Sequence, residues 1–220
     1  MGFDLGETLY HYSAAPLRWL EDARPALEML MVAGGVDLSK AHLAGAGPRP
    51  RNCRTRLCER VGRAAATGPV AASLATLFGV LRRSLVIYPG AVETLAALKE
   101  VGFAVGALTN VPLGLPRRTI QYDLERLGLG PYIDAFVTSF EAGSRKPRLE
   151  PFARLACALR LAPRQIAYVG NLPSDVSGSR AAGCVPILLD WNRTGRDYGQ
   201  AATVHELAEI PGLLRRAAQE

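Results

Sequence analysis

Polar residues with reactive side chains stand directly after apolar segments at several points of this 220-residue chain. Asp4 follows the apolar N-terminal residues, Thr109 and Asn110 follow a second apolar run, and Lys146 lies beyond a third. A carboxylate can attack phosphorus and form an acyl phosphate. Hydroxyl and amide donors can bind the transferring oxygens, and a lysine ammonium neutralises carboxylate and phosphate. These residue types suit phosphoryl transfer.

A second group with acidic character, Gly170–Asn171–Leu172–Pro173–Ser174–Asp175, follows a fourth apolar run. Its oxygen atoms would complete a site for Mg²⁺, which prefers carboxylates, carbonyls and waters. Each residue alone also has an ordinary explanation. Asp4 or Asp175 suits a helix N-cap, Thr109 a turn and Lys146 a solvated surface. The functional interpretation therefore depends on whether the fold brings these residues together.

The elements that must position them form a regular pattern, because short apolar segments alternate with helix-length segments from residue 89 onward. This alternation predicts an α/β fold with a doubly wound parallel sheet. Ligands bind such sheets at the carboxyl ends of the strands, where the polar groups above fall. The expected strands are Phe103 to Thr109, Ala135 to Ser139, Ile166 to Gly170 and Val185 to Leu189; the expected helices are Gly90 to Val101, Arg117 to Leu127, Arg148 to Leu161, Ser174 to Ala182 and Val204 to Ala218.

The segment from Ser13 to Ser84 has a different character. Its apolar residues follow a helical period, as in Leu74-Leu77-Phe78-Leu81, and no segment in it is typical of a strand. A cluster of glycine and proline residues at 45–50 divides it into two halves. We therefore predict a helical insertion between the first strand, which ends near Leu5, and the rest of the sheet.

The order and spacing of the motifs resemble the haloacid dehalogenase superfamily. Its first motif, D-x-D-x-T, is similar to Asp4 to Thr8, and its second, a Ser or Thr that ends an apolar strand, corresponds to Thr109. Its third motif, a lysine often followed by proline, corresponds to Lys146-Pro147. Its fourth, G-D-x-x-x-D, corresponds to Gly170 to Asp175. The resemblance covers the whole chain.

The resemblance implies a Rossmann-like hydrolase core of residues 1–12 and 85–220, with residues 13–84 as an α-helical cap. It implies a Mg²⁺-dependent phosphatase that forms an aspartyl phosphate on Asp4. Thr109, Asn110 and Lys146 are the expected ligands of the substrate's phosphoryl group. The implied metal ligands are Asp4, the main-chain carbonyl of Gly6, Asn171 and Asp175.

Two positions depart from the pattern. Gly6 replaces the aspartate that protonates the leaving oxygen and then activates water, a contribution typically worth about 10²–10⁴-fold in rate. Asn171 replaces an aspartate, and its uncharged amide predicts weaker magnesium binding. We expect either a neighbouring group or a substrate with a good leaving group to compensate for Gly6. The nearby candidates are Glu7, Tyr10 and His11, and His11 titrates closest to neutrality.

Composition narrows the remaining possibilities. Hydrophobic residues make up 49% of the chain and charged residues 21%, which indicates a globular protein with a sizeable core. No apolar run is long enough to span a membrane, and no secretory signal precedes Asp4, so we expect a cytoplasmic protein. The four cysteines lack zinc-site spacing. The sequence carries no signal of oligomeric state.

The formal net charge is +6, and six arginines gather between Arg49 and Arg63. This stretch could attract nucleic acid or phosphorylated ligands. Because no aromatic residues are interleaved for base stacking, a solvated loop is the favoured interpretation and nucleic acid is not an expected partner.

Three functions follow from these observations. The first is a phosphatase of a small phosphorylated metabolite. The second is carbon–halogen cleavage, which uses an aspartate nucleophile but needs no magnesium. The third is a catalytically weakened binding protein, which Gly6 and Asn171 motivate. The presence of Asp4, Thr109, Lys146 and Asp175 argues against a complete loss of chemistry.

Overall fold

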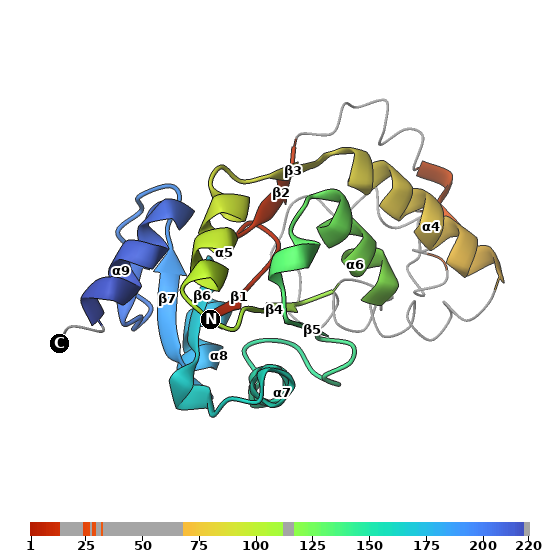
Figure 1. Ribbon diagram of the computed structural model, residues 1–220. Helices are drawn as coiled ribbons and strands as arrows, with labels where there is room; N and C mark the ends of the chain where they lie inside the picture. The colour runs from red at the N-terminus through yellow and green to blue at the C-terminus, as the bar shows by residue number, and fades with distance from the viewer. Residues whose placement is uncertain (14–23, 27, 30–31, 33–67, 112–116, 218–220) are drawn as a thin grey trace. The chain divides into compact units, whose positions relative to one another are not determined.

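The computed structural model describes residues 1–13, 24–26, 28–29, 32, 68–111 and 117–217 (Figure 1). The chain divides into two compact units. The first comprises Met1–His11, Val86–Asn110 and Arg117–Glu220, and the second comprises Tyr12–Leu85 and Val111–Pro116. All of the site residues expected from the sequence belong to the first unit.

A six-stranded sheet forms the centre of the first unit, and every neighbouring pair of its strands is parallel. The short strand that precedes Asp4 is central, with Gly2 aligned to Gly106 on one side and to Tyr168 on the other. This sheet confirms the predicted α/β class. Across the sheet, the strands are β5 (Ala135–Thr138), β4 (Gly106–Thr109), β1 (Gly2–Phe3), β6 (Ala167–Gly170), β7 (Val185–Leu189) and β8 (Ala202–Val204).

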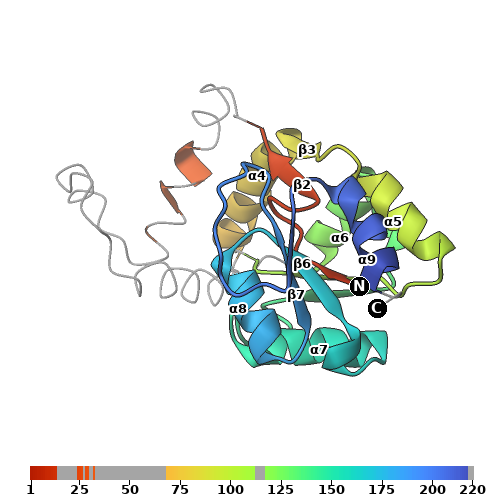
Figure 2. The ribbon, with the colours of Figure 1, turned by 90° about the vertical axis from the view of Figure 1, so that its left-hand side faces the viewer.

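Helices cover both faces of this sheet, as the two views of the ribbon show (Figures 1 and 2). On one face, α7 packs against β4 and β5, while α8 packs against β6 and β7. On the other face, α5 contacts α9. The helices are α5 (Ala91–Glu100), α6 (Arg117–Arg126), α7 (Leu149–Leu159), α8 (Pro173–Ala181) and α9 (Ile210–Ala217), with the short 3₁₀ turns η1 (Gly130–Tyr132), η2 (Pro163–Gln165) and η3 (Leu207–Glu209).

Glycines follow the ends of three helices. Gly102, Gly128 and Gly183 have φ values of 84°, 73° and 82°, in the left-handed region that glycine enters without a Cβ clash. The helix α7 ends differently, because its C-cap is Arg160 with φ 56°. The boundaries of the four helices predicted between residues 90 and 182 agree with the structure to within two residues at each end.

The C-terminal region differs from the prediction. The helix expected over Val204 to Ala218 begins only at Ile210, and Ala202–Val204 instead forms the edge strand β8. Val204 is 2% exposed and aligns with Leu189 of β7. A strand of three residues has too short a pattern to detect, and its pairing with β7 is a non-local interaction that outweighs helix propensity.

The insertion predicted over residues 13–84 is described in part. The helix α4 (Gly68–Arg83) belongs to the second unit, and its Leu77 and Phe78 are buried as the helical period indicated. Two short strands that the sequence did not signal, β2 (Tyr10–Tyr12) and β3 (Leu85–Ile87), form a separate sheet where the chain leaves and re-enters the first unit. The glycine–proline break at 45–50 and the arginines of 49–63 lie outside the described residues.

Glycines in the core allow bulky side chains to approach the backbone closely. A Cβ at Gly106 would lie 2.7 Å from Leu155 Cδ1. On α8, a Cβ at Gly178 would lie 2.6 Å from Phe152 Cε2 and 2.8 Å from the Cα of Pro147. Because Pro147 follows Lys146 directly, this contact sets how closely α8 approaches the lysine segment.

We predict that Gly178→Ala lowers the free energy of unfolding by about 1–3 kcal/mol, because the methyl group must displace Phe152 or the Pro147 backbone. Gly79→Ala in α4 is the matched control. Among the described residues, no atom lies within 4 Å of a Cβ at Gly79, and the higher helix propensity of alanine should stabilise by up to about 1 kcal/mol. Urea unfolding measures both, and equal effects would contradict the packing argument.

Candidate active site

Three buried charged side chains meet at the carboxyl edge of the sheet. Asp4 follows β1, where its N–H donates to the Val169 carbonyl at 2.8 Å. Lys146 Nζ lies 2.6 Å from Asp4 Oδ1 and 2.6 Å from Asp175 Oδ1. All three residues are less than 7% exposed. The fold therefore joins three of the residues that the sequence analysis singled out, although they lie far apart in the chain.

The pKa values reflect this arrangement. Burial raises the pKa of Asp4 to about 6, opposed by the Lys146 charge and reinforced by Asp175. Burial alone would lower the pKa of Lys146, but the two carboxylates outweigh it and raise the pKa. The ammonium is therefore firmly charged. With both carboxylates ionised, the group carries a net charge of −1, which favours an additional cation.

Asp175 lies in the first turn of α8, and a hydrogen bond at that end of the helix holds its side chain. Its Oδ2 accepts the N–H of Leu172 at 3.0 Å, so it caps the first turn of α8 from within. The approach is close, because a Cβ at Gly170 would lie 2.4 Å from Asp175 Cγ. Its Oδ1 lies 2.6 Å from the Lys146 ammonium, which is its charged partner.

Tyr168 forms a buried hydrogen bond with the Lys146 ammonium. Its hydroxyl accepts from Lys146 Nζ at 3.1 Å and donates to the Leu108 carbonyl at 3.1 Å. Burial raises its pKa well above the ordinary value, and the two carboxylates add to the effect, so the hydroxyl stays protonated. The sequence analysis missed Tyr168 because it counted as one apolar residue of a strand. The available signal was that a buried tyrosine needs a partner for its hydroxyl.

Thr109 and Asn110 stand at the end of β4, beside the lysine segment. Thr109 is the last residue of the strand and is 8% exposed. The Asn110 side chain contacts both main-chain groups of Lys146: Oδ1 accepts its N–H at 2.9 Å, and Nδ2 donates to its carbonyl at 3.3 Å. Asn110 thus orients the Lys146 segment. The sequence predicted only a contact of Asn110 with the substrate's phosphoryl group.

The loop after Asp4 lies next to the loop after β6. Thr8 Oγ1 donates to Asn171 Oδ1 across 3.4 Å, a long hydrogen bond, and Gly6 forms a bridge with Tyr10. Among the described residues, no atom lies within 4 Å of a Cβ built on Gly6. The residues that the resemblance implied for a metal site, namely Asp4, Gly6, Asn171 and Asp175, therefore belong to adjoining loops.

The donor set of these loops is suited to magnesium. No group of three or more His, Cys, Asp or Glu side chains that could hold a metal occurs in the described part of the chain. Two carboxylates with a main-chain carbonyl and an amide oxygen nevertheless match Mg²⁺, which takes few protein ligands and keeps several waters. The observation that fits a cation here is that two buried carboxylates share the one ammonium of Lys146, which leaves a net negative charge.

The three residues considered as substitutes for the missing acid differ in their surroundings. Tyr10 is buried, at 3% exposure. Glu7 is exposed and accepts a hydrogen bond from the Tyr88 hydroxyl at 3.0 Å. The His11 ring lies 4.7 Å from the Tyr88 ring. Glu7 and His11 thus both contact Tyr88, which the sequence analysis did not consider.

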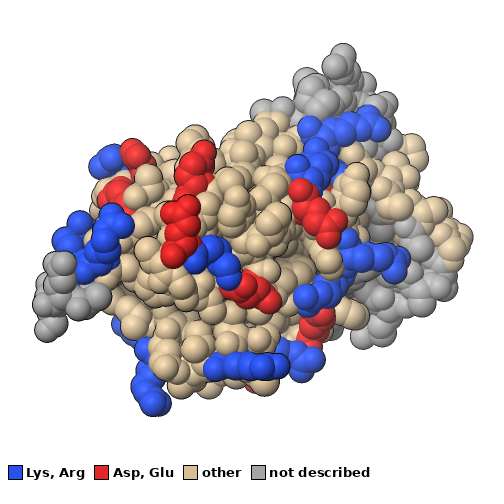
Figure 3. Space-filling model, viewed as in Figure 1, with Lys and Arg blue, Asp and Glu red and all other residues tan. Residues whose placement is uncertain are grey.

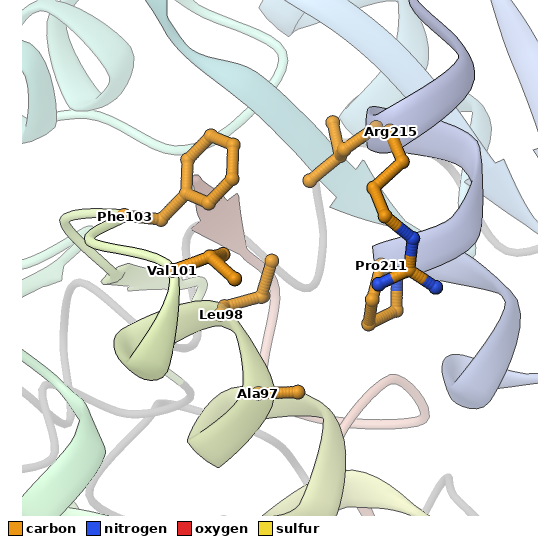
Figure 4. Close-up of a pocket in the computed structure, with 7 residues that line it drawn as sticks. Ala97, Leu98, Val101, Phe103, Pro211 and Arg215 are labelled. Atoms are coloured by element: carbon orange, nitrogen blue, oxygen red, sulfur yellow. The ribbon is translucent and has the colours of Figure 1, made fainter. Parts of the chain in front are cut away.

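An apolar pocket of about 140 Å³ lies away from these residues, between α5 and α9 (Figure 4). It is lined by Leu98, Val101, Phe103, Pro211 and neighbouring side chains. Phe103 precedes β4, so the pocket is at the amino ends of the strands rather than at the carboxyl edge. Its lining is apolar apart from Arg215, and we do not assign it to the active site.

The surface charge is mixed. On the face seen in Figure 3, basic and acidic side chains are interspersed over the described residues. Two of the contacts between them are Lys99 with Asp134 and Arg117 with Glu141. Such a mixed face gives no extended basic surface for nucleic acid. Among the described helices, none is long and apolar enough to cross a membrane.

A doubly wound parallel sheet with an aspartate, a lysine and a second aspartate at its carboxyl edge is the arrangement of an α/β protein that binds its ligand at that edge. The chain belongs to the haloacid dehalogenase-like hydrolases, because the sequence profile of that family matches residues 2–183. The resemblance drawn from the four motifs is thereby confirmed.

Curated relatives agree with this assignment. The chain is 29% identical over 127 residues to the phosphoglycolate phosphatase of Salmonella typhimurium, a match covering 58% of this chain and 48% of that protein. It is also 29% identical over 115 residues to the Escherichia coli phosphoglycolate phosphatase, covering 52% of this chain and 43% of that protein. The matches thus span about half the length of these relatives.

Solved structures share the fold. A 2-haloacid dehalogenase from Pseudomonas syringae superposes with a TM-score of 0.64 at 23% identity, covering 98% of this chain and 97% of that one. A HAD phosphatase from Thermococcus onnurineus gives 0.62 at 19% identity, covering 97% and 96%. The same fold therefore occurs in a phosphatase and in a dehalogenase.

We predict that Tyr168→Phe weakens the lysine site. Loss of the hydroxyl removes one partner from the buried ammonium and one donor from the Leu108 carbonyl, which should lower the free energy of unfolding by about 1–2 kcal/mol. The matched control is Tyr132→Phe in η1, a partly buried tyrosine of a different element. Thermal or urea unfolding of the two variants checks this, and an effect no larger than that of the control would refute the supporting role.

Proposed function

We propose that this protein is a Mg²⁺-dependent phosphatase that hydrolyses a small phosphorylated metabolite through an aspartyl phosphate on Asp4. The observation that supports the proposal most is the buried contact of Asp4, Lys146 and Asp175. The phosphoglycolate phosphatases among the relatives make phosphoglycolate the first substrate to test. The family membership supports a hydrolase of this mechanistic type.

In the first step, the Asp4 carboxylate attacks the substrate phosphorus, and the bond from phosphorus to the leaving oxygen breaks. Lys146 keeps Asp4 ionised and oriented in spite of its burial, because the ammonium lies 2.6 Å from Oδ1. Thr109 and Lys146 bind the phosphoryl oxygens. In the second step, water attacks the acyl phosphate, releasing inorganic phosphate and restoring Asp4.

Magnesium would be held by Asp4, the Gly6 carbonyl, Asn171 and Asp175. When bound, it supplies positive charge that offsets the charge developing on the phosphoryl oxygens. Asn171 brings no charge of its own and already accepts from Thr8, so we expect a higher magnesium requirement than in a site with a third carboxylate.

Proton transfer is the task for which this site lacks a side chain. Gly6 stands where family phosphatases carry their acid, so the leaving oxygen must depart without that help. We therefore propose that the preferred substrates have good leaving groups, such as acyl or aryl phosphates. A leaving group of low pKa needs little protonation in the transition state.

Gly6 also favours a second candidate function, dehalogenation. A halide ion leaves as a stable anion and requires no proton, so the missing acid would not hinder displacement of a halide by Asp4. Metal dependence separates the two candidates, since phosphoryl transfer needs Mg²⁺ and halide displacement does not.

We predict turnover of aryl and acyl phosphates that requires both Mg²⁺ and Asp4, with slower turnover of phosphoglycolate because it is an alkyl phosphate. EDTA should abolish the release of inorganic phosphate, and Asp4→Asn should lower it by about 10³-fold or more, because the amide is a far weaker nucleophile. The folded state of Asp4→Asn is checked by circular dichroism. Chloride release that resists EDTA would favour dehalogenation, and absence of any turnover would favour a binding protein that kept the fold.

We predict that Gly6→Asp raises the rate on substrates with poor leaving groups. The described residues leave open space for the new side chain, and the Gly6 backbone is outside the left-handed region, so aspartate fits without strain. The gain should reach about 10²-fold for an alkyl phosphate and remain small for an aryl phosphate. Gly6→Asn is the control of similar size without an acid. Equal rate changes on both substrates would contradict the leaving-group argument.

A further inference from the structure

The residue after Gly6 adopts an unusual backbone conformation. Glu7 has φ 58°, a left-handed value that glycine adopts readily and that residues with a Cβ avoid. It is exposed, so close packing of its side chain does not impose this conformation. Within the loop, the Glu7 N–H donates to the Tyr10 carbonyl at 2.7 Å. Contacts from outside the loop add to this hydrogen bond.

Two aromatic residues hold Glu7 by separate groups. The Trp191 indole Nε1 donates to the main-chain carbonyl of Glu7 at 3.1 Å. The Tyr88 hydroxyl donates to Glu7 Oε2 at 3.0 Å. One contact therefore fixes the peptide between Glu7 and Thr8, and the other fixes the side chain. Charge-assisted hydrogen bonds of the second kind are stronger than neutral ones.

The two aromatic residues also hold each other. The Tyr88 and Trp191 rings stack with centroids 4.3 Å apart and an interplanar angle of 16°. The Tyr88 N–H donates to the Leu9 carbonyl at 3.0 Å. The His11 ring also lies against the Tyr88 ring. The stack is thus attached to the loop after Glu7 as well as to Glu7 itself.

The segment that carries Trp191 is itself well fixed. The Asp190 N–H donates to the Val204 carbonyl at 2.8 Å. The Asp190 carboxylate accepts from the Thr194 hydroxyl at 3.1 Å and from the Gly195 N–H at 3.0 Å. Trp191 therefore extends from a turn anchored to the sheet, and it can restrain the loop rather than follow it.

We propose that Trp191 and Tyr88 are positioning residues of the nucleophile loop, which hold Glu7 in its left-handed conformation and so orient the Gly6 and Glu7 peptide groups beside Asp4. The consequence for rate rests on the proposed function, whereas the consequence for loop order does not. The hydrogen bonds from Trp191 and Tyr88 offset the conformational cost of placing glutamate, which has a Cβ, at a backbone position that suits glycine.

The test is a set of double-mutant cycles built on Trp191→Phe, which keeps an aromatic ring and removes the indole N–H. It is combined with Glu7→Gly, which adopts the left-handed conformation unaided, and with Glu7→Ala, which does not. Both Glu7 variants lose the Tyr88 contact, so they differ only in backbone preference. Glu7→Ala is thereby the matched control for Glu7→Gly.

The first readout is hydrogen exchange of the loop amides, which needs no substrate. The N–H groups of Glu7, Thr8 and Leu9 donate to main-chain carbonyls and are protected. We expect Trp191→Phe to speed their exchange about tenfold or more in the wild-type and Glu7→Ala backgrounds, and by less than about twofold with Glu7→Gly. An equal increase in all three backgrounds would overturn the proposal and leave Trp191 as a packing residue.

The second readout is kcat and KM for the substrate found in the phosphate-release assay. Trp191→Phe should lower kcat about tenfold in the wild-type background and by less than about twofold with Glu7→Gly, with KM changed less than kcat. Loss of kcat that is independent of residue 7 would also overturn the proposal. If no substrate is turned over, the proposed function fails while the exchange measurement still decides the role of Trp191.

Discussion

The site depends on a single buried cation, the Lys146 ammonium, placed between two carboxylates. Each of these charges alone would be strongly unfavourable in the interior, and removal of the ammonium would leave two buried carboxylates uncompensated. Because Asp4, Lys146 and Asp175 follow three different strands, their contact also fixes the relative positions of three loops. Tyr168 and Asn110 complete the arrangement by holding the head and the backbone of the lysine. Under the proposed function, the same side chains carry both the structural and the catalytic roles.

Under the proposed function, the two halves of phosphoryl transfer chemistry are preserved unequally. The groups that would attack and bind phosphorus are present and buried, while Gly6 stands where the family pattern has its proton donor. In the same loop, Glu7 has a left-handed backbone conformation and forms hydrogen bonds with Tyr88 and Trp191. Both features lie close to Asp4 in the sequence, but their effects differ. Gly6 lacks a carboxylate side chain. The left-handed conformation of Glu7 makes the loop depend on contacts with Tyr88 and Trp191, which lie far away in the sequence. A loop altered in this way still presents Asp4 to Lys146.

Much of the fold and of the candidate site could be predicted from the sequence, because the strands from β4 to β7 are buried on both faces and appear as continuous apolar runs. The motif residues at their ends could be found for the same reason. Tyr168 and Asn110 could not be assigned their roles, since their contacts with Lys146 cross many residues of chain and leave no local pattern. The edge strand β8 was missed because three residues carry no period, and Trp191 because nothing in its neighbourhood points to Glu7. The cap expected over residues 13–84 stays a prediction.

The open space beside Gly6 also has an evolutionary meaning. The glycine codons GGU and GGC become aspartate codons through one base change, and the described structure presents neither a clash nor a strained backbone to such a change. Where codon 6 is GGU or GGC, an aspartate at this position is thus a single base change away. Under selection for turnover of unreactive phosphate esters, the aspartate would be readily accessible. Persistence of glycine in a lineage would accordingly indicate that its selected chemistry does not require that acid.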